Sequence, residues 1–186
     1  MKAILILLCS ITLTAAHLQA QSMYFTRNGK VSFFSKTPME NIDAVNNEVF
    51  SVIDFQKGEI AFAILIKSFR FERALMEEHF NENYMESTKF PKATFNGKIN
   101  NTDKINLKQN GTYPVQITGD MTIHGVTKKI TAEGKMTIDD NGISALSNFL
   151  LKVKDFDIAI PSLVAEKIAD TVEVTVDCQY KPKESK

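Results

Sequence analysis

The chain has 186 residues, with 22 basic and 22 acidic side chains, no tryptophan and two cysteines. This length fits one domain, and a neutral chain without a basic block argues against a nucleic-acid partner. Cys9 lies in a leader-like stretch, so the rest of the chain keeps only Cys178 and cannot form an internal disulfide. Its stability must therefore come from packing.

The first 20 residues carry a lysine, then an apolar run, then small residues, which is the layout of a secretory signal peptide. The apolar run is too short to cross a bilayer. We expect cleavage after Ala20, with cleavage after Ala16 as the alternative. The mature domain, 21–186, is then a secreted protein without a transmembrane segment, and the periplasm is its expected compartment.

The first strands of the domain are predicted from their turns. Asn28-Gly29 stands between two β-prone runs, which predicts an opening hairpin because both residues tolerate positive φ. The polar run 40–47 is expected to form a loop or an irregular edge. A second hairpin follows, from 48–54 to 59–67. Both faces of the latter strand are apolar, so we expect both of them to be covered.

One helix interrupts the predicted strands. Apolar side chains recur at helical spacing over 71–81, with charged residues on the other side, which indicates an amphipathic helix. Its apolar stripe has no other partner in a β chain, so we expect it to cover one end or flank of the sheet. Pro91 stops any helix, and the segment 93–99 restarts the sheet.

The most informative strand pair spans 113–139, with His124-Gly125 as its two-residue loop. With that loop, each opposed pair on the apolar face includes one small residue: Gly119 with Ile130, Ile117 with Ala132, and Val115 with Gly134. We interpret this face as under-filled, because a filled core would use larger side chains there. The small residues therefore predict space reserved for a ligand.

The chain ends with a strand over 143–154, a short helix at 162–168 and a strand over 171–180 whose alternate apolar residues face inward. About eight antiparallel strands at short spacing, with one inserted helix, predict an all-β fold: a closed antiparallel barrel. A barrel of this size either fills its interior with side chains or holds one ligand. The small residues on the apolar face of the 113–139 strand pair favour a barrel that holds a ligand over a filled one.

Two runs carry a family resemblance. HFNENYMESTKFPKATFNGKI, at 79–99, has a histidine, acidic and aromatic residues, and then Lys-Phe-Pro before another phenylalanine. GDMTIHGVTK, at 119–128, is the second run, with Met121 where leucine is usual. In this order they resemble the two motifs of the YceI-like, polyisoprenoid-binding family, and the resemblance spans roughly 23–180. It implies a lipocalin-like barrel that holds an isoprenoid chain.

We therefore expect non-catalytic binding of a polyisoprenoid, an isoprenoid quinone or another lipid in an apolar tunnel, for storage or transport in the cell envelope. No cofactor, metal or catalytic residue is expected. The residues expected along the tunnel are Phe62, Ile64, Leu75, Phe80, Phe95, Ile117, Gly119, Met121, Ile130, Ala132, Gly134 and Val174.

Other chemistry has weaker support. His79 and Glu82 could serve a metal-assisted hydrolase, but a solvated helix face is the preferred interpretation. His124 at a hairpin tip indicates a structural role, and Cys178 reads as a small core residue. No Gly-x-Ser-x-Gly elbow occurs. A ligand-free structural or interaction domain is the main alternative, and the sequence leaves the oligomeric state open.

Overall fold

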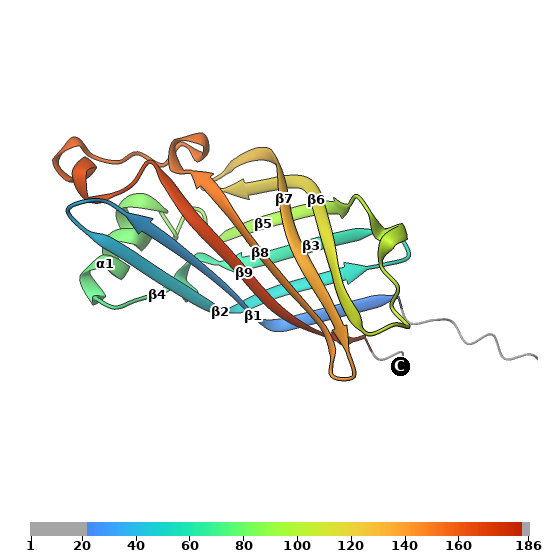
Figure 1. Cartoon of the computed structure of the whole chain (residues 1–186). Coiled ribbons are helices and arrows are strands. Elements are labelled where there is room, and N and C mark those ends of the chain that lie inside the picture. The colour runs from blue at the N-terminus through green and yellow to red at the C-terminus, as the bar shows by residue number, and fades with distance from the viewer. Residues whose placement is uncertain (1–21, 184–186) are drawn as a thin grey trace, which may run out of the picture.

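The computed structural model describes residues 22–183, so the leader expected over 1–20 and its cleavage sites lie outside the described residues. Within these described residues the sheet has nine antiparallel strands, of which β4 (Arg70–Phe71) is a two-residue addition. The other eight are β1 (Met23–Lys36), β2 (Asn41–Asp54), β3 (Glu59–Leu65), β5 (Lys92–Ile99), β6 (Gly111–Ile123), β7 (Val126–Asp139), β8 (Gly142–Lys152) and β9 (Thr171–Pro182). Because β1 also pairs with β2, these eight close into the predicted all-β barrel (Figure 1).

The two ends of the barrel differ. One end, here called the helix end, carries α1 (Ala74–His79), the β1–β2 turn and the segment 153–168 (Figure 1). The other, here called the packed end, carries the β2–β3 and β7–β8 turns. The short helical turns are η1 (Ile66–Ser68), η2 (Phe80–Tyr84), η3 (Thr102–Lys104), η4 (Val153–Phe156) and η5 (Ser162–Lys167). Among the described residues, no helix is both long enough and apolar enough to span a membrane.

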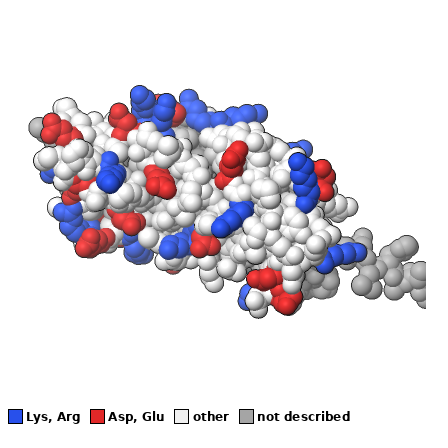
Figure 2. All heavy atoms as spheres, viewed as in Figure 1, with Lys and Arg blue, Asp and Glu red and all other residues white. Residues whose placement is uncertain are grey.

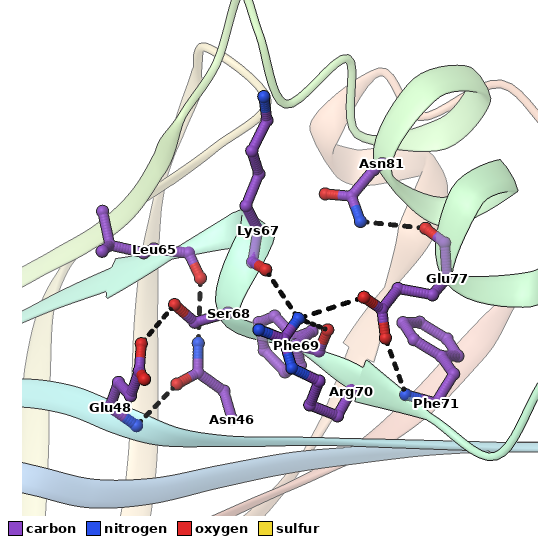
Figure 3. Close-up of polar contacts among 10 residues, drawn as sticks. All are labelled: Asn46, Glu48, Leu65, Lys67, Ser68, Phe69, Arg70, Phe71, Glu77 and Asn81. Atoms are coloured by element: carbon purple, nitrogen blue, oxygen red, sulfur yellow. Dashed lines mark hydrogen bonds and ion pairs between the residues drawn. The ribbon is translucent and has the colours of Figure 1, made fainter. Parts of the chain in front are cut away.

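The only α-helix in the described residues, α1, is shorter than the predicted stretch 71–81 and continues into the π-helical turn η2. Phe71 lies in β4 instead, where it pairs with Ala44 of β2. The Glu77 carboxylate accepts hydrogen bonds from the Phe71 N–H at 3.3 Å and from Arg70 Nη1 at 3.0 Å (Figure 3). These bonds hold β4 against the helix, so the helix begins later than the apolar spacing predicts.

The hairpin predicted at Asn28-Gly29 is wrong, because β1 runs through both residues. The pairing of β1 with β2 shifts register on either side of Gly29, which makes this site a β-bulge. A Cβ at Gly29 would lie 2.6 Å from Cys178 Sγ, so the close approach of β9 requires glycine there. The chain turns instead at Thr37, whose Oγ1 accepts a hydrogen bond from the Glu40 N–H at 3.1 Å.

The loop or irregular edge predicted for 40–47 is also wrong, because β2 starts at Asn41. Asn46 is fully buried in this strand. Its Nδ2 donates to Leu65 O at 2.8 Å, and its Oδ1 accepts from the Glu48 N–H at 2.8 Å (Figure 3). Both ends of the buried amide are therefore satisfied. Closure of the barrel supplies these partners, which a local run of polar residues does not reveal.

The remaining strand pairs form as predicted. β2 and β3 turn through Gly58, with φ of 66°, and the β6–β7 loop is His124-Gly125, with φ of 51° and 78°. Both loop residues have the positive φ of a type I′ hairpin turn. The predicted register is confirmed in all three pairs: Gly119 with Ile130, Ile117 with Ala132, and Val115 with Gly134. Near the C-terminus, the strand predicted over 143–154 corresponds to β8, the short helix predicted at 162–168 to η5, and the strand predicted over 171–180 to β9.

The barrel interior is filled at the packed end. The fully or nearly fully buried side chains there include Ile53, Ile60, Val115, Met136, Ile138, Ile143, Cys178 and Tyr180. Ser51 Oγ donates to Ala61 O at 2.9 Å, so the Tyr180 hydroxyl 2.8 Å away donates to Ser51 Oγ. This end is therefore a core without room for a ligand, and its polar groups are paired.

Alkaline pH is expected to weaken the fold through this core. Burial raises the pKa of the Cys178 thiol from an ordinary value of 9.0 to about 11, and burial also raises the pKa of Tyr180. Because the folded pKa exceeds the unfolded one, the stabilisation is complete below about pH 9 and is lost as the pH rises towards 11. For Cys178 alone, a shift from 9.0 to about 11 corresponds to a loss of about 3 kcal/mol in the free energy of unfolding.

Urea unfolding at a series of alkaline pH values measures this loss, and the Cys178→Ala variant is the matched control. The variant should show a shallower fall in the free energy of unfolding with pH, because Tyr180 alone remains. Equal slopes for both proteins would contradict the assignment to Cys178.

Candidate functional site

A cavity of about 490 Å³ occupies the helix-end half of the barrel. All eight barrel strands contribute to its wall, and α1, η2 and the segment 158–168 complete it. The wall is overwhelmingly aliphatic and aromatic. Its volume falls within the range of about 300–1,000 Å³ that is usual for small-molecule sites. The predicted barrel is therefore filled at one end and hollow at the other.

The structure brings ten of the twelve predicted tunnel residues together around this cavity. They are Phe62, Ile64, Leu75, Phe80, Phe95, Ile117, Met121, Ile130, Ala132 and Val174. Inward alternation along β3, β5, β6, β7 and β9 places eight of them, because side chains two residues apart share a face. Leu75 and Phe80 come from α1 and η2 at the helix end.

Gly119 and Gly134 do not line the cavity, so their interpretation as reserved space is wrong. Gly119 pairs with Gly97 of β5, and a Cβ at Gly119 would clash with the backbone there. A Cβ at Gly134 would lie 2.7 Å from Leu146 O. Both positions are small because neighbouring strands come too close for a side chain.

The facing glycines Gly97 and Gly119 also form a seat for an aromatic ring. A Cβ at Gly97 would lie 2.6 Å from the Phe95 ring, and a Cβ at Gly119 would lie 2.7 Å from it. The Phe95 ring therefore lies against the bare backbone of β5 and β6, and Phe95 is buried as a result. Glycines beside an aromatic ring in a sheet are a known way to seat that ring.

Four phenylalanines form an aromatic cluster beside the cavity at the helix end: Phe33, Phe69, Phe71 and Phe80. The Phe80 ring centroid lies 5.6, 5.5 and 5.0 Å from those of Phe33, Phe69 and Phe71. These separations are typical of favourable aromatic pairs. Leu75, by contrast, is 60% exposed although it reaches the rim of the cavity. The helical segment is therefore anchored through Phe80.

The segment after β8 forms a part of the wall that was not predicted from the sequence. Ile158, Ile160, Val164 and Ile168 all line the cavity. The short helix η5 was predicted, but not its contact with the barrel interior. The available signal was a set of isolated apolar residues in a stretch without helix or strand periodicity.

Among the residues that the structure describes, the charged side chains that line this cavity lie at its rim. They are Glu40 in the β1–β2 turn, Arg73 directly before α1, His79 at the end of α1 and Lys167 in η5, and Arg73 forms an ion pair with Glu40. Deeper in the cavity, Ser147 Oγ already donates to a main-chain carbonyl of β7 at 2.6 Å. The interior therefore offers apolar contacts and few free polar groups, which suits a hydrocarbon chain.

His124 lies outside the cavity lining and connects three segments at the helix end. Its Nε2 donates to Glu86 Oε2 at 2.9 Å, and its Nδ1 faces Phe156 O at 3.3 Å. Its ring meets the Phe90 ring edge-on at 4.6 Å between centroids. Both polar partners accept, so the two bonds coexist when both ring nitrogens carry protons. These contacts support the predicted structural role of His124.

Across residues 22–183, no three histidine, cysteine, aspartate or glutamate side chains converge as metal ligands would. His79 and Glu82 are both exposed on the helical segment. Cys178 is fully buried in the core. Lysines, arginines, aspartates and glutamates are interspersed over the face seen in Figure 2.

Three solved structures resemble this barrel. A polyisoprenoid binding domain from Saccharophagus degradans has a TM-score of 0.76 at 15% identity, covering 88% of this chain and 100% of that one. BcnA from Burkholderia cenocepacia has a TM-score of 0.68 at 17% identity, covering 80% and 94%. The YCEI protein from Campylobacter jejuni has a TM-score of 0.54 at 16% identity, covering both chains fully. At these identities the likeness establishes the fold.

Sequence comparison establishes the family. No curated protein matches the chain significantly. A family model for the YceI-like domain, however, matches residues 11–180. That span includes every barrel strand except the last two residues of β9. Because the match covers most of the sequence and the barrel agrees with it, this chain belongs to the YceI-like family.

Proposed function

We propose that this protein binds one long apolar molecule, such as a polyisoprenoid or an isoprenoid quinone, in the cavity at the helix end and performs no reaction on it. The observation that carries the proposal is the apolar cavity itself, whose charged side chains are confined to the rim. The polyisoprenoid-binding domain with the same fold adds support for a ligand of this class.

Burial of hydrocarbon would supply the binding energy. Each methylene group transferred from water into the cavity contributes about 0.8 kcal/mol. About ten such groups therefore supply about 8 kcal/mol, the free energy of micromolar affinity, without a single hydrogen bond. Ordering a flexible chain opposes binding, and the hydrogen-bonded strand pairs that form much of the wall limit the cost on the protein side.

The signal-like leader supports storage or transport of this ligand in the cell envelope, with a periplasmic location. The neutral net charge, together with the interspersed charges on the face shown in Figure 2, argues against a nucleic-acid partner. A ligand-free structural or interaction domain would be expected to fill its barrel, so the cavity favours binding over that alternative.

A buried charge tests the proposal. Replacing Ile130, which lines the cavity, with aspartate should weaken binding of the prenol geranylgeraniol by at least about tenfold, because hydrocarbon cannot solvate a carboxylate. Displacement of the fluorescent dye Nile red by the prenol measures this affinity.

The matched control is Leu150→Asp, since Leu150 is 73% exposed and does not line the cavity. This variant should bind the prenol as the unmodified protein does. If the Ile130→Asp variant and the control bind the prenol with equal affinity, the prenol does not bind in this cavity. Absence of any prenol binding by the unmodified protein would contradict the proposed ligand class.

A further inference from the structure

The cavity stops at one level of the barrel on six strands. The deepest lining residues are Phe62 on β3, Phe95 on β5, Ile117 on β6, Ala132 on β7, Ser147 on β8 and Val176 on β9. The inward residues one step nearer the packed end, such as Ile60, Val115 and Cys178, are buried and do not line it. The cavity therefore has a floor at a defined depth.

The side chains beneath the floor form a close-packed core. Ile53, Met136 and Cys178 beneath it are fully buried, and the Tyr180 hydroxyl is bonded to Ser51 Oγ at 2.8 Å. Because interiors of this kind are close-packed, extending the cavity downwards would require side chains to leave the core. A ligand chain that reaches this level can go no further.

Two aromatic rings dominate the floor. The Phe62 and Phe95 centroids lie 6.3 Å apart, with the ring planes tilted by 59°. Phe95 is held by its seat on Gly97 and Gly119, so its ring cannot move towards the β5–β6 wall. Phe62 has no such seat and is only partly buried. Phe62 is therefore the floor residue whose removal deepens the cavity with the least disturbance of the strands.

We propose that Phe62, backed by the seated Phe95, sets the length of hydrocarbon chain that this barrel accepts. The inference rests on the proposed function and adds a specificity-determining residue to it. Carbons up to the floor leave water on binding, whereas carbons beyond that length stay outside the helix end. Affinity should therefore rise with chain length up to a limit and then level off.

Saturated primary alcohols of increasing length, each displacing Nile red, test this proposal. For the unmodified protein, affinity should rise by about fourfold with each added methylene and then reach a plateau. Phe62→Ala should move the plateau to longer alcohols, because the space freed by the ring extends the cavity. Ala132→Leu should move it to shorter ones, because the larger side chain raises the floor.

The matched control is Phe50→Ala, which makes the same chemical change at a 38% exposed residue outside the cavity lining, and it should leave the plateau unchanged. If Phe62→Ala does not fold, Ala132→Leu still tests the floor, because its plateau should move to shorter alcohols. A plateau at the same length in every folded variant would overturn the inference while leaving the proposed function intact. Failure of the unmodified protein to bind any alcohol would overturn both.

Discussion

Replacing Phe80 with alanine should lower the free energy of unfolding by about 3 kcal/mol, the lower end of the range for buried phenylalanines because Phe80 keeps some exposure. Phe80 is the common partner of Phe33, Phe69 and Phe71, with centroids 5.0–5.6 Å away. Truncation removes all three ring contacts and opens the helix end. The helical segment would then lose its main anchor to the barrel.

The control for this prediction lies one and a half turns earlier on the same helical segment. Leu75 is 60% exposed, so Leu75→Ala should cost less than about 1 kcal/mol. Urea unfolding of both variants measures the difference. Similar losses for the two variants would mean that the segment is held by its exposed apolar residue as much as by the aromatic cluster, contrary to the structure.

Leucine substitutions at Gly119 and Ala132 should have opposite consequences, although both positions lie on the same face of the β6–β7 hairpin. At Gly119 even a Cβ clashes with the backbone of Asn96 and Gly97, so Gly119→Leu should destabilise the fold by about 3 kcal/mol or more. At Ala132 the new side chain enters the cavity, so the cost should stay within about 1 kcal/mol while prenol binding weakens.

Thermal unfolding and Nile red displacement on the same two variants provide the comparison. Gly119→Leu should lose stability, and Ala132→Leu should lose affinity with its melting temperature nearly unchanged. If Ala132→Leu instead loses stability and keeps its affinity for the prenol, the space beside Ala132 is part of a filled core and the cavity assignment fails.

Strand pairing could be predicted from the sequence where the loop type and the apolar alternation together determine the register. The two-residue loop His124-Gly125 and the apolar alternation on either side predicted three opposed pairs of β6 and β7, and all three are present. Asn28-Gly29 shows the limit of such local signals. The same dipeptide that suits a hairpin also suits a bulge, and only the approach of Cys178 from β9 decides between them.

The candidate site was predictable to a similar extent and for the same reason. Strand alternation determines which side chains point inward and accounts for eight of the ten expected residues that line the cavity, whereas Leu75 and Phe80 come from the helical segment. Gly119 and Gly134 were misread because a small residue fits either an empty space or a crowded one, and the distance to the next strand decides which. The 158–168 wall has no periodicity that would indicate its orientation.

The measurement that tests the central claim most directly is native mass spectrometry of the protein released from the periplasm, its proposed compartment, combined with analysis of its organic extract. We predict a mature chain that begins at Gln21 and carries one long-chain, isoprenoid-type lipid, and an Ile130→Asp variant purified in parallel that carries far less. A chain without bound lipid, whose extract matches that of the variant, would contradict the proposal that this cavity holds a lipid in the cell envelope.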